Sequence, residues 1–248
     1  MEKPKISIIT VCYNAEKTIQ KTLDSVLNQS YPNIEIVIVD GQSTDGTLAI
    51  IEKHKDSIHQ FTSEKDKGIF DAMNKGISMA TGDYIWFIHA DDQIFDRDTL
   101  DKAMEHHHDE DFIYGKAMLV DEHGDERPLD ERKQHPEQNE LDWKRMLNGM
   151  IICHQAMIVK KEIAPFYDLS YNLVGDLDWV IRILKNTNNV RDTHQILCRF
   201  VEGGTSTQYR RASLKQRFAI LRRHFGLFPT IWQHITILLA AIRRRSIR

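Results

Sequence analysis

Short apolar runs alternate with segments of helical periodicity over the first 92 residues of the chain. Buried strands are predicted for four of these runs: 6–11, 34–39, 58–62 and 85–88. Amphipathic helices are predicted for the three segments between them: 19–27, 47–55 and 69–80. This alternation indicates an α/β fold, in which a mostly parallel sheet carries helices on both faces.

The second half of the chain has a less regular pattern. It predicts a helix over 99–106, a strand over 112–120 and, after the turn at His123-Gly124, a hairpin partner over 126–129. The polar run 130–140 is expected to form an exposed loop. The remaining predicted elements are a short helix, a strand, a helix, a strand and two C-terminal helices: 141–147, 156–159, 176–184, 195–201, 209–225 and 230–245.

The composition is ordinary for a globular protein of 248 residues, with 41% hydrophobic and 28% charged residues. No apolar run approaches the roughly 18 residues of a membrane-spanning helix, and no signal segment precedes the first strand. The three cysteines, Cys12, Cys153 and Cys198, form neither an even set nor a CxxC pair. These features predict a cytoplasmic protein without disulfide bonds.

The net charge of −3 conceals an asymmetry. Residues 209–248 contain ten Lys or Arg and no Asp or Glu. Residues 1–208 contain the other 23 basic residues and all 36 acidic residues, so their net charge is −13. Apolar residues of 228–248, with Trp232 and a run of arginines, predict a basic amphipathic helix that lies peripherally on the anionic inner face of the cell membrane. Packing against the domain or a second subunit, as in a homodimer, is the alternative. We expect no nucleic-acid partner.

Polar side chains follow three of the predicted strands at the point where each strand ends: Tyr13, Asp40, Asp91 and Asp92. Ligands of α/β sheets bind beyond the carboxyl ends of the strands. Paired carboxylates there favour a hard divalent cation that bridges to phosphates, with a helix cap as the alternative. Asp40 suits a ribose diol or a uracil imide, or else caps a turn, and Tyr13 suits a base or the core. No dinucleotide fingerprint or P-loop is present.

Several motifs in this order closely resemble family 2 of the inverting glycosyltransferases, of the type that builds colanic acid and capsules. They are dense between residues 5 and 92 and looser from residue 112 onward. The matching segments are 7–14, 24–31, 38–47, 66–76 and 82–92. The resemblance implies a GT-A fold (Rossmann-like, with helices flanking a mostly parallel central sheet), here with a C-terminal helical extension. It also implies a nucleotide-diphosphate sugar donor, a divalent metal (Mn or Mg) and inversion at the anomeric carbon.

Carried over by position, the resemblance assigns donor-site roles to residues of the first half. Tyr13 and Asp40 match the pair that binds the base and nucleoside. Asp66 and Lys67 match the lining of the nucleotide-sugar pocket. Asp91 and Asp92 match the acidic metal motif, although this chain has His89 where many members have the first acid of an Asp-x-Asp motif.

The resemblance assigns catalysis to the second half. Asp176 matches the general base that takes the proton of the acceptor hydroxyl, and a helix N-cap is the alternative role. Asp178 is the runner-up for the base, and both cannot face the same substrate atom because they lie roughly 200° apart around a helix. The expected acceptor residues are His154, Asp178 and Trp179, although a structural role for His154 is an equal alternative. Residues 203–206 resemble a loop that folds over the donor diphosphate, or form a plain connector. His106-His107-His108 are interpreted as a polar helix end, because consecutive histidines do not share a helix face.

The predicted organisation is a single glycosyltransferase domain over 1–226, with the C-terminal helix over 227–248. Its nucleotide half spans about 1–120 and its acceptor half about 121–226. The expected activity is inverting transfer from a UDP-sugar to a hydroxyl of a saccharide or lipid-linked oligosaccharide, in cell-surface polysaccharide synthesis. A sugar nucleotidyltransferase is one alternative, and a catalytically inactive donor-binding partner of another transferase is the other.

Overall fold

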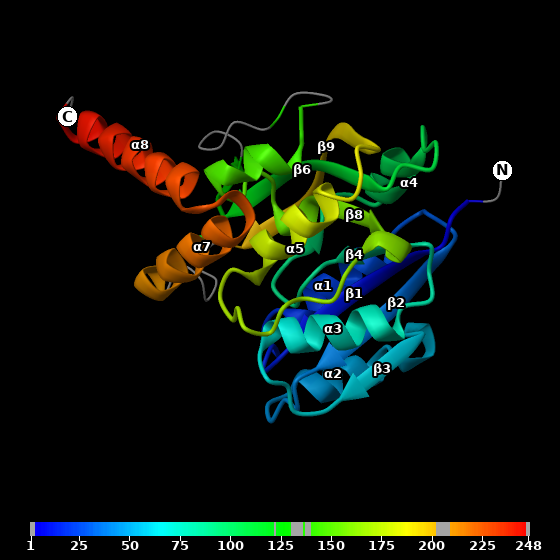
Figure 1. Ribbon diagram of the computed structural model, residues 1–248. Helices are drawn as coiled ribbons and strands as arrows, with labels where there is room; N and C mark the ends of the chain where they lie inside the picture. Colours follow the sequence, from blue (N-terminus) through cyan, green and yellow to red (C-terminus); the bar gives the residue numbers. More distant parts are fainter. Residues whose placement is uncertain (1–2, 122, 130–135, 137–139, 202–208, 247–248) are drawn as a thin grey trace.

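A computed structural model describes residues 3–121, 123–129, 136, 140–201 and 209–246, with the side chains of the last helix described as far as Thr236. The first half forms a parallel sheet with the strand order β3-β2-β1-β4. Its strands are β1 (Ile6–Cys12), β2 (Ile34–Asp40), β3 (Gln60–Ser63) and β4 (Tyr84–Phe87). Its helices are α1 (Ile19–Leu27), α2 (Thr47–Lys53) and α3 (Ile69–Met79). Figure 1 shows α3 lying along this part of the sheet.

The second half continues the same sheet with mixed strand directions, in the order β4-β8-β6-β9-β5. β8 runs antiparallel to both β4 and β6, whereas β9 runs parallel to β6. The strands are β5 (Gln93–Ile94), β6 (Phe112–Val120), β7 (Glu126–Pro128), β8 (Met157–Lys160) and β9 (Val190–Val201). The helices are α4 (Thr99–Met104), α5 (Gly175–Leu184), α7 (Arg210–Phe225) and α8 (Leu227–Ser246).

Most of the predicted elements are confirmed within one to three residues, including the hairpin, in which β7 pairs antiparallel with β6. The two-residue strand β5 was not predicted, and β9 begins five residues before the predicted strand. The short helix predicted over 141–147 is a 3₁₀ helix, Trp143–Asn148. Of the polar run 130–140, only residues 136 and 140 lie within the described residues. Parallel pairing holds throughout the first four strands, but the second half mixes both directions.

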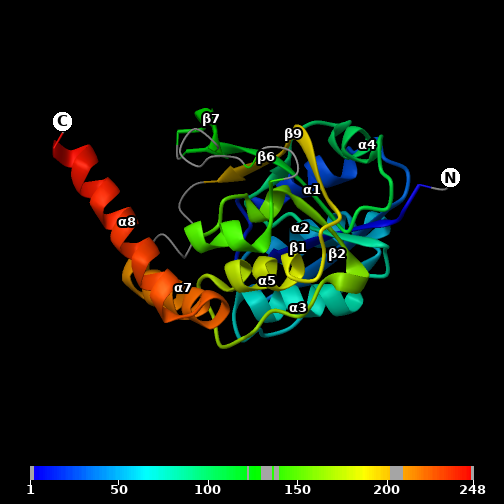
Figure 2. The same cartoon turned by 45° about the horizontal axis from the view of Figure 1, so that its top comes forward.

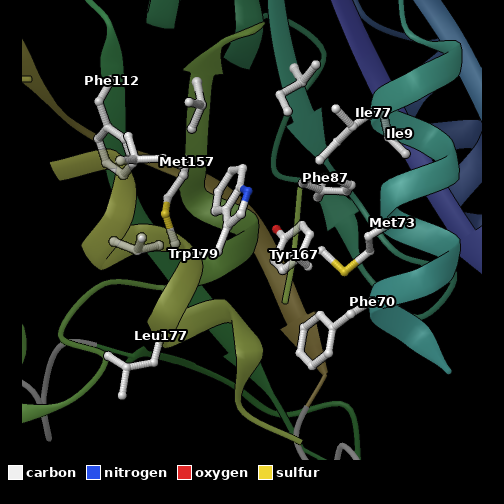
Figure 3. Packing of buried hydrophobic residues seen from close by; sticks show 14 of the residues in the cluster. Ile9, Phe70, Met73, Ile77, Phe87, Phe112, Met157, Tyr167, Leu177 and Trp179 are labelled. Carbon is white, nitrogen blue, oxygen red and sulfur yellow. The ribbon is translucent and has the colours of Figure 1, made fainter. Parts of the chain in front are cut away.

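Two apolar layers form the core, one on each face of the sheet. Alternate residues of β1 point to opposite faces, as the strand pleat requires: Ile9 and Val11 join one layer, and Ile6 and Ile8 join the other. In the first layer, side chains of α3 meet those of the α5 region around Phe87 (Figure 3). The core therefore joins the two halves of the chain in one sheet.

The last helix, α8, leaves the body of the molecule. Gly226, with φ +85°, separates it from α7, in a backbone conformation that few residues other than glycine adopt. Gln233 Nε2 donates a hydrogen bond of 2.5 Å to Asn148 Oδ1 near the start of the helix. Beyond this point α8 extends away from the sheet in both views (Figures 1 and 2). Among the described residues, no helix combines the length and apolar character needed to cross a bilayer.

Candidate active site

The carboxyl ends of three parallel strands lie side by side at one edge of the sheet. In the strand register, Cys12 of β1 pairs with Asp40 of β2, and Asp40 pairs with Ser63 of β3. Tyr13 therefore follows β1 beside the end of β2. Since ligands of α/β sheets bind at this edge, the register supports the site predicted from the strand ends.

Gly41 marks the point where three chain segments converge. A Cβ atom added at Gly41 would lie 2.8 Å from Asp66 Oδ2 and 3.4 Å from Tyr13 Cδ2. The sequence-predicted residues Tyr13 and Asp66 are thus brought to the same place, from the end of β1 and the loop after β3. The side chain of Tyr13 is 65% exposed there, so one part of its ring is open to a ligand.

Asp40 lies beneath this point and has no exposed surface. Its carboxylate accepts hydrogen bonds from the Ser43 backbone N–H (2.9 Å), the Ser43 hydroxyl (2.5 Å) and the Ser63 hydroxyl (2.6 Å). These donors satisfy the buried carboxyl group from within the protein. In this conformation Asp40 shapes the floor of the site, and a direct contact with a ligand would require one of the serines to move.

The loop between β3 and α3 carries the other two predicted donor residues. Asp66 pairs with Lys75 of α3, with 2.5 Å between Oδ1 and Nζ. Lys67 is exposed, and its backbone N–H donates to Asp71 Oδ2 over 3.0 Å. The loop is thereby held at two points against α3, while the Lys67 ammonium group stays in solvent.

Asp91 and Asp92 occupy different environments although they are adjacent. Asp91 is exposed and accepts a hydrogen bond of 2.8 Å from the Thr18 hydroxyl. Asp92 is 3% exposed. Burial raises the pKa of Asp92 to about 7, and the charge of Asp91 adds to this, against hydrogen bonds from the Val201 N–H and Gln155. The structure thus separates the two predicted metal ligands, leaving only Asp91 open to solvent.

His89 stands where many family members have the first acid of the Asp-x-Asp motif. Burial lowers its pKa to about 4, and its Nδ1 atom is buried without a hydrogen-bond partner. The ring stacks on that of His154, with 5.8 Å between centroids and 9° between planes. Burial, followed by the neighbouring His89, lowers the pKa of His154 to about 3. Both imidazoles are therefore uncharged at neutral pH.

A divalent ion at this edge of the sheet would need oxygen ligands from these side chains. Among the described residues, no group of three or more His, Cys, Asp or Glu side chains is arranged to hold a metal. Magnesium and similar ions often use one or two carboxylates together with water and substrate phosphates. The exposed carboxylate of Asp91 fits such an ion, whereas the carboxyl of Asp92 is buried and accepts a hydrogen bond from the Val201 N–H.

Asp176 lies in the first turn of α5, near a cluster of buried rings. Burial raises the pKa of Tyr167, and the charge of Asp176 adds to that effect. The Tyr167 hydroxyl lies 2.7 Å from His154 Nε2. Ring contacts of Phe87 with His89, His154 and Tyr167 connect this cluster to the end of β4. Figure 3 shows Phe87 and Tyr167 of this cluster. The predicted base and the acidic motif therefore border the same buried cluster.

Two of the expected acceptor residues face the interior instead. Asp178 has no exposed surface and binds Arg182 Nε and His224 Nε2, each at 2.7 Å. Trp179 is 1% exposed, stacks on Tyr167 and donates from Nε1 to the Pro165 carbonyl over 2.6 Å. Asp178 and Trp179 therefore hold α5 in place. Asp178 binds α7 on one side of the helix, and Trp179 packs in the core on the other.

Sequence reasoning assigned no role to Tyr167 or Lys75. Tyr167 lies outside the segments of clear periodicity, and only its ring contacts reveal it. Lys75 belongs to a segment that resembles the family, but its position in the sequence does not indicate a contact with Asp66. Residues 203–206, expected to form a donor loop, lie outside the described residues. His107 follows the end of α4 and pairs with Glu110 over 2.8 Å, in agreement with a polar helix end.

The family model for glycosyl transferase family 2 matches residues 7–164. A PGL/p-HBAD biosynthesis glycosyltransferase of Mycobacterium tuberculosis (strain ATCC 25177 / H37Ra) is 31% identical over 215 residues, covering 82% of this chain and 79% of that protein. The Bacillus subtilis (strain 168) protein TuaG, named as a teichuronic acid biosynthesis glycosyltransferase, is 29% identical over 254 residues, 98% of each chain.

Two solved structures are similar to this fold. Staphylococcus aureus TarS 1–349, in complex with UDP-GlcNAc, has a TM-score of 0.72 at 20% identity, covering 89% of this chain and 66% of that chain. The mannosyltransferase PcManGT of Pyrobaculum calidifontis, in complex with GDP-Man and Mn²⁺, has a TM-score of 0.66 at 19% identity, covering 99% and 76%. At these identities the likeness establishes the fold.

Proposed function

This chain belongs to glycosyl transferase family 2, and from that premise we propose that it transfers a sugar from a UDP-sugar donor to a saccharide or lipid-linked hydroxyl, with inversion. The observation that carries the proposal is the convergence of Tyr13 and Asp66 on Gly41 at the strand edge. The names of relatives in glycolipid and teichuronic acid biosynthesis support an acceptor that belongs to the cell surface. UDP is supported by the bound donor of TarS.

In the proposed donor site, the exposed ring of Tyr13 stacks on the base and Asp66 accepts from a nucleoside hydroxyl or N–H. Asp40 supports this surface from below through Ser43 and Ser63. The exposed ammonium group of Lys67 is free to approach the negative charge of the diphosphate. Each of these residues supplies binding and orientation of the donor.

Asp91 is the residue that would hold a manganese or magnesium ion, since its carboxylate is open to solvent. Such an ion neutralises charge that develops on the leaving diphosphate. Asp92 supports the turn that carries Asp91, because it accepts from the Val201 N–H over 3.4 Å. His89, uncharged and stacked on His154, orients this turn without adding a negative charge.

Asp176 is the proposed general base. As the acceptor oxygen forms its bond to the anomeric carbon, the bond from that carbon to the diphosphate oxygen breaks on the opposite face. The acceptor proton passes to the Asp176 carboxylate, and the nucleoside diphosphate leaves with the electron pair. The buried Tyr167–His154 pair beside Asp176 excludes water from that side of the carboxylate.

A calorimetric titration with UDP and GDP, with and without Mn²⁺, tests the donor site. We expect UDP to bind, and to bind more tightly with the ion. The Asp176→Asn variant should keep the UDP affinity of the parent protein but lose transfer from its UDP-sugar by at least about 10³-fold, since an amide cannot accept the proton.

Four outcomes would contradict parts of this proposal. Absence of nucleotide binding under every condition excludes a donor-binding enzyme. Lost UDP affinity in Asp176→Asn makes Asp176 a donor-site or structural residue. Binding without turnover over a screen of nucleotide sugars and acceptors favours an inactive partner, and release of pyrophosphate from sugar phosphate and UTP favours a nucleotidyltransferase.

We also propose that residues 1–226 form the catalytic domain and that α8 carries it to an anionic membrane surface. Exposed apolar side chains at helical spacing cover one face of its first turns: Phe228, Ile231, Trp232 and Ile235. Exposed basic side chains lie on the preceding helix α7: Arg210, Arg211, Lys215, Arg222 and Arg223. An apolar face beside such charges suits the boundary between acyl chains and anionic headgroups.

Co-sedimentation with vesicles tests this part of the proposal. The full chain should bind phosphatidylglycerol/phosphatidylcholine vesicles and lose that binding in high salt, whereas a chain ending at Gly226 should remain unbound. Equal binding of the two chains overturns it. A full chain that forms a dimer in light scattering, ignores vesicles and becomes monomeric on truncation would instead assign α8 to a second copy.

A further inference from the structure

Lys75 lies on the solvent side of α3. Its ammonium group contacts several residues of the loop between β3 and α3. Its Nζ lies 2.5 Å from Asp66 Oδ1 and 3.0 Å from Glu64 Oε1, and donates over 3.2 Å to the Lys65 carbonyl. Asp71, one helical turn before it, lies 3.9 Å away. The side chain of Lys75 is only 22% exposed, so these contacts are shielded in part from water.

The carboxylate of Asp66 is thereby used on both of its oxygens. Oδ1 accepts from Lys75, whereas Oδ2 is the atom that faces Gly41, the residue that the Tyr13 ring also faces. A carboxylate without such a partner rotates freely about its last bond. Because Lys75 holds Oδ1, Oδ2 stays directed toward the surface on which the donor base and ribose would lie.

The same contacts hold the backbone of the loop. Glu64 N–H donates to the Asp40 carbonyl over 3.0 Å, which fixes the start of the loop to the end of β2. Lys75 binds the next carbonyl, that of Lys65, and Asp71 accepts from the Lys67 N–H over 3.0 Å. The loop therefore depends on α3 for its position at its centre and at its end.

Charge gives Lys75 a second effect. Glu64, Asp66 and Asp71 are three carboxylates close to a site proposed for an anionic diphosphate, and Lys75 is the cation that contacts all three. Its removal would leave these three carboxylates without the cation that contacts all of them. The expected loss is then in donor binding, because the acceptor and the proposed base Asp176 lie at the second half of the sheet.

We propose that Lys75 is a positioning residue of the donor site, which aims Asp66 at the nucleoside and offsets the acidic charge of the 64–71 segment. The inference rests on the proposed function, since a nucleotide sugar is the ligand that Asp66 would meet. Lys75 acts through Asp66 and the loop, and does not itself contact the donor.

Titration calorimetry with UDP and Mn²⁺ compares the parent protein with Lys75→Met. The variant should bind UDP about tenfold more weakly, as for the loss of one partner of a partly buried charge pair. The KM for the UDP-sugar should rise by the same factor, with kcat within about twofold of the parent value. Lys102→Met, which removes an exposed lysine paired with Asp98 on α4, is the control with the same charge change and should bind UDP normally.

A double-mutant cycle separates positioning from a general effect on stability. If Lys75 acts through Asp66, then Lys75→Met should add little to the weakened UDP binding of Asp66→Asn, and Lys75→Arg should restore most of the affinity. Parent-like UDP binding by Lys75→Met, or fully additive losses in the double variant, would overturn the inference. If the parent protein binds no nucleotide, the proposed function itself is overturned. The titrations of the parent and of the Lys102→Met control reveal this result independently of the Lys75 variants.

Discussion

Buried carboxylates of this protein differ in the balance between burial and the hydrogen bonds that they accept, and this balance shifts their pKa values in opposite directions. Burial raises the pKa of Asp92 to about 7, since the hydrogen bonds it accepts do not offset the loss of solvent. Burial also acts on Glu35, but there hydrogen bonds from Ser7, Thr81 and Lys5 outweigh it and lower the pKa to about 2. The carboxyl of Asp92 therefore holds its proton to a higher pH than an ordinary aspartate, whereas Glu35, in β2, stays charged down to acidic pH.

Glu35→Gln should reveal the charge on Glu35 as a pH-dependent stability. The carboxylate accepts from the Ser7 hydroxyl (2.5 Å) and from the N–H and hydroxyl of Thr81 (2.7 and 2.6 Å). Because the folded pKa lies below the ordinary value of 4.5, its contribution is present above that value and is lost as the pH falls toward 2. We expect the variant to lose roughly 2 to 3 kcal/mol of unfolding free energy at pH 7.

Urea denaturation at pH 7 and pH 3 measures this difference. The gap between parent and variant should shrink to less than half at pH 3, because the unfolded chain has by then bound a proton at Glu35 that the folded carboxylate does not yet bind. A gap that is the same at both pH values would mean that packing, and not charge, explains the loss. Glu105→Gln, at an exposed position after α4, is the control and should change the stability little at either pH.

At the scale of elements, α3 links the two halves of the site. Its apolar face, with Phe70, Met73 and Ile77, packs into the core, while Lys75 holds the loop before the helix. Asn74 binds the backbone of Tyr167 on both sides, accepting from its N–H over 2.7 Å and donating to its carbonyl over 3.0 Å. One helix therefore positions the donor loop and the segment that leads to Asp176.

Asn74→Ala should affect both stability and turnover. It leaves the N–H and carbonyl of Tyr167 without their protein partners, at an expected cost of about 1 to 3 kcal/mol of unfolding free energy. It also frees the Tyr167 ring that contacts His154, so kcat should fall more than UDP affinity does. Chemical denaturation and steady-state kinetics measure the two effects. Ser78→Ala, at an exposed position on the same helix, is the control and should change neither quantity. If Asn74→Ala has the stability and kcat of the parent protein, the hydrogen bonds between Asn74 and the Tyr167 backbone are dispensable.

At the scale of the whole molecule, both halves of the chain belong to one sheet, and α7 packs against the second half. The family 2 membership and the GT-A fold implied by the resemblance are confirmed. α7 buries Ile220 and Leu221 against the body and brings His224 to Asp178 of α5. Beyond Gly226 the chain changes character, since α8 presents exposed apolar side chains and extends away from the sheet (Figure 2).

Asp178→Asn should weaken the attachment of α7 to the body. The buried carboxylate pairs with Arg182 and His224, and its loss leaves the Arg182 charge and the hydrogen bonds of both partners uncompensated, at an expected cost of about 3 kcal/mol. Asp168→Asn removes a partly exposed pair with Arg223 at the same helix and should cost less than about 1 kcal/mol. Urea unfolding compares the two. Equal losses would contradict a special role for the buried pair.

The sequence by itself determined the local elements and the residues that follow the strands. β-branched runs and helical spacing are properties of neighbouring residues, so they predicted β1, β2, α1 and α3 nearly to the residue. Tyr13, Asp40 and Asp91 were found because parallel strands end at one edge of a sheet. Their roles in binding and catalysis, like that of Asp176, stay predictions.

Only the tertiary structure decided which of these side chains are open and what each one touches. The burial of Asp92, the interior contacts of Asp178 and Trp179, and the Tyr167–His154 pair all depend on segments brought together from elsewhere in the chain. Burial and hydrogen bonding then determine whether a carboxyl is charged, and neither quantity is a property of local sequence. For the same reason Lys75, one lysine among many in the sequence, became visible as a partner of Asp66 only once α3 and its preceding loop were folded together.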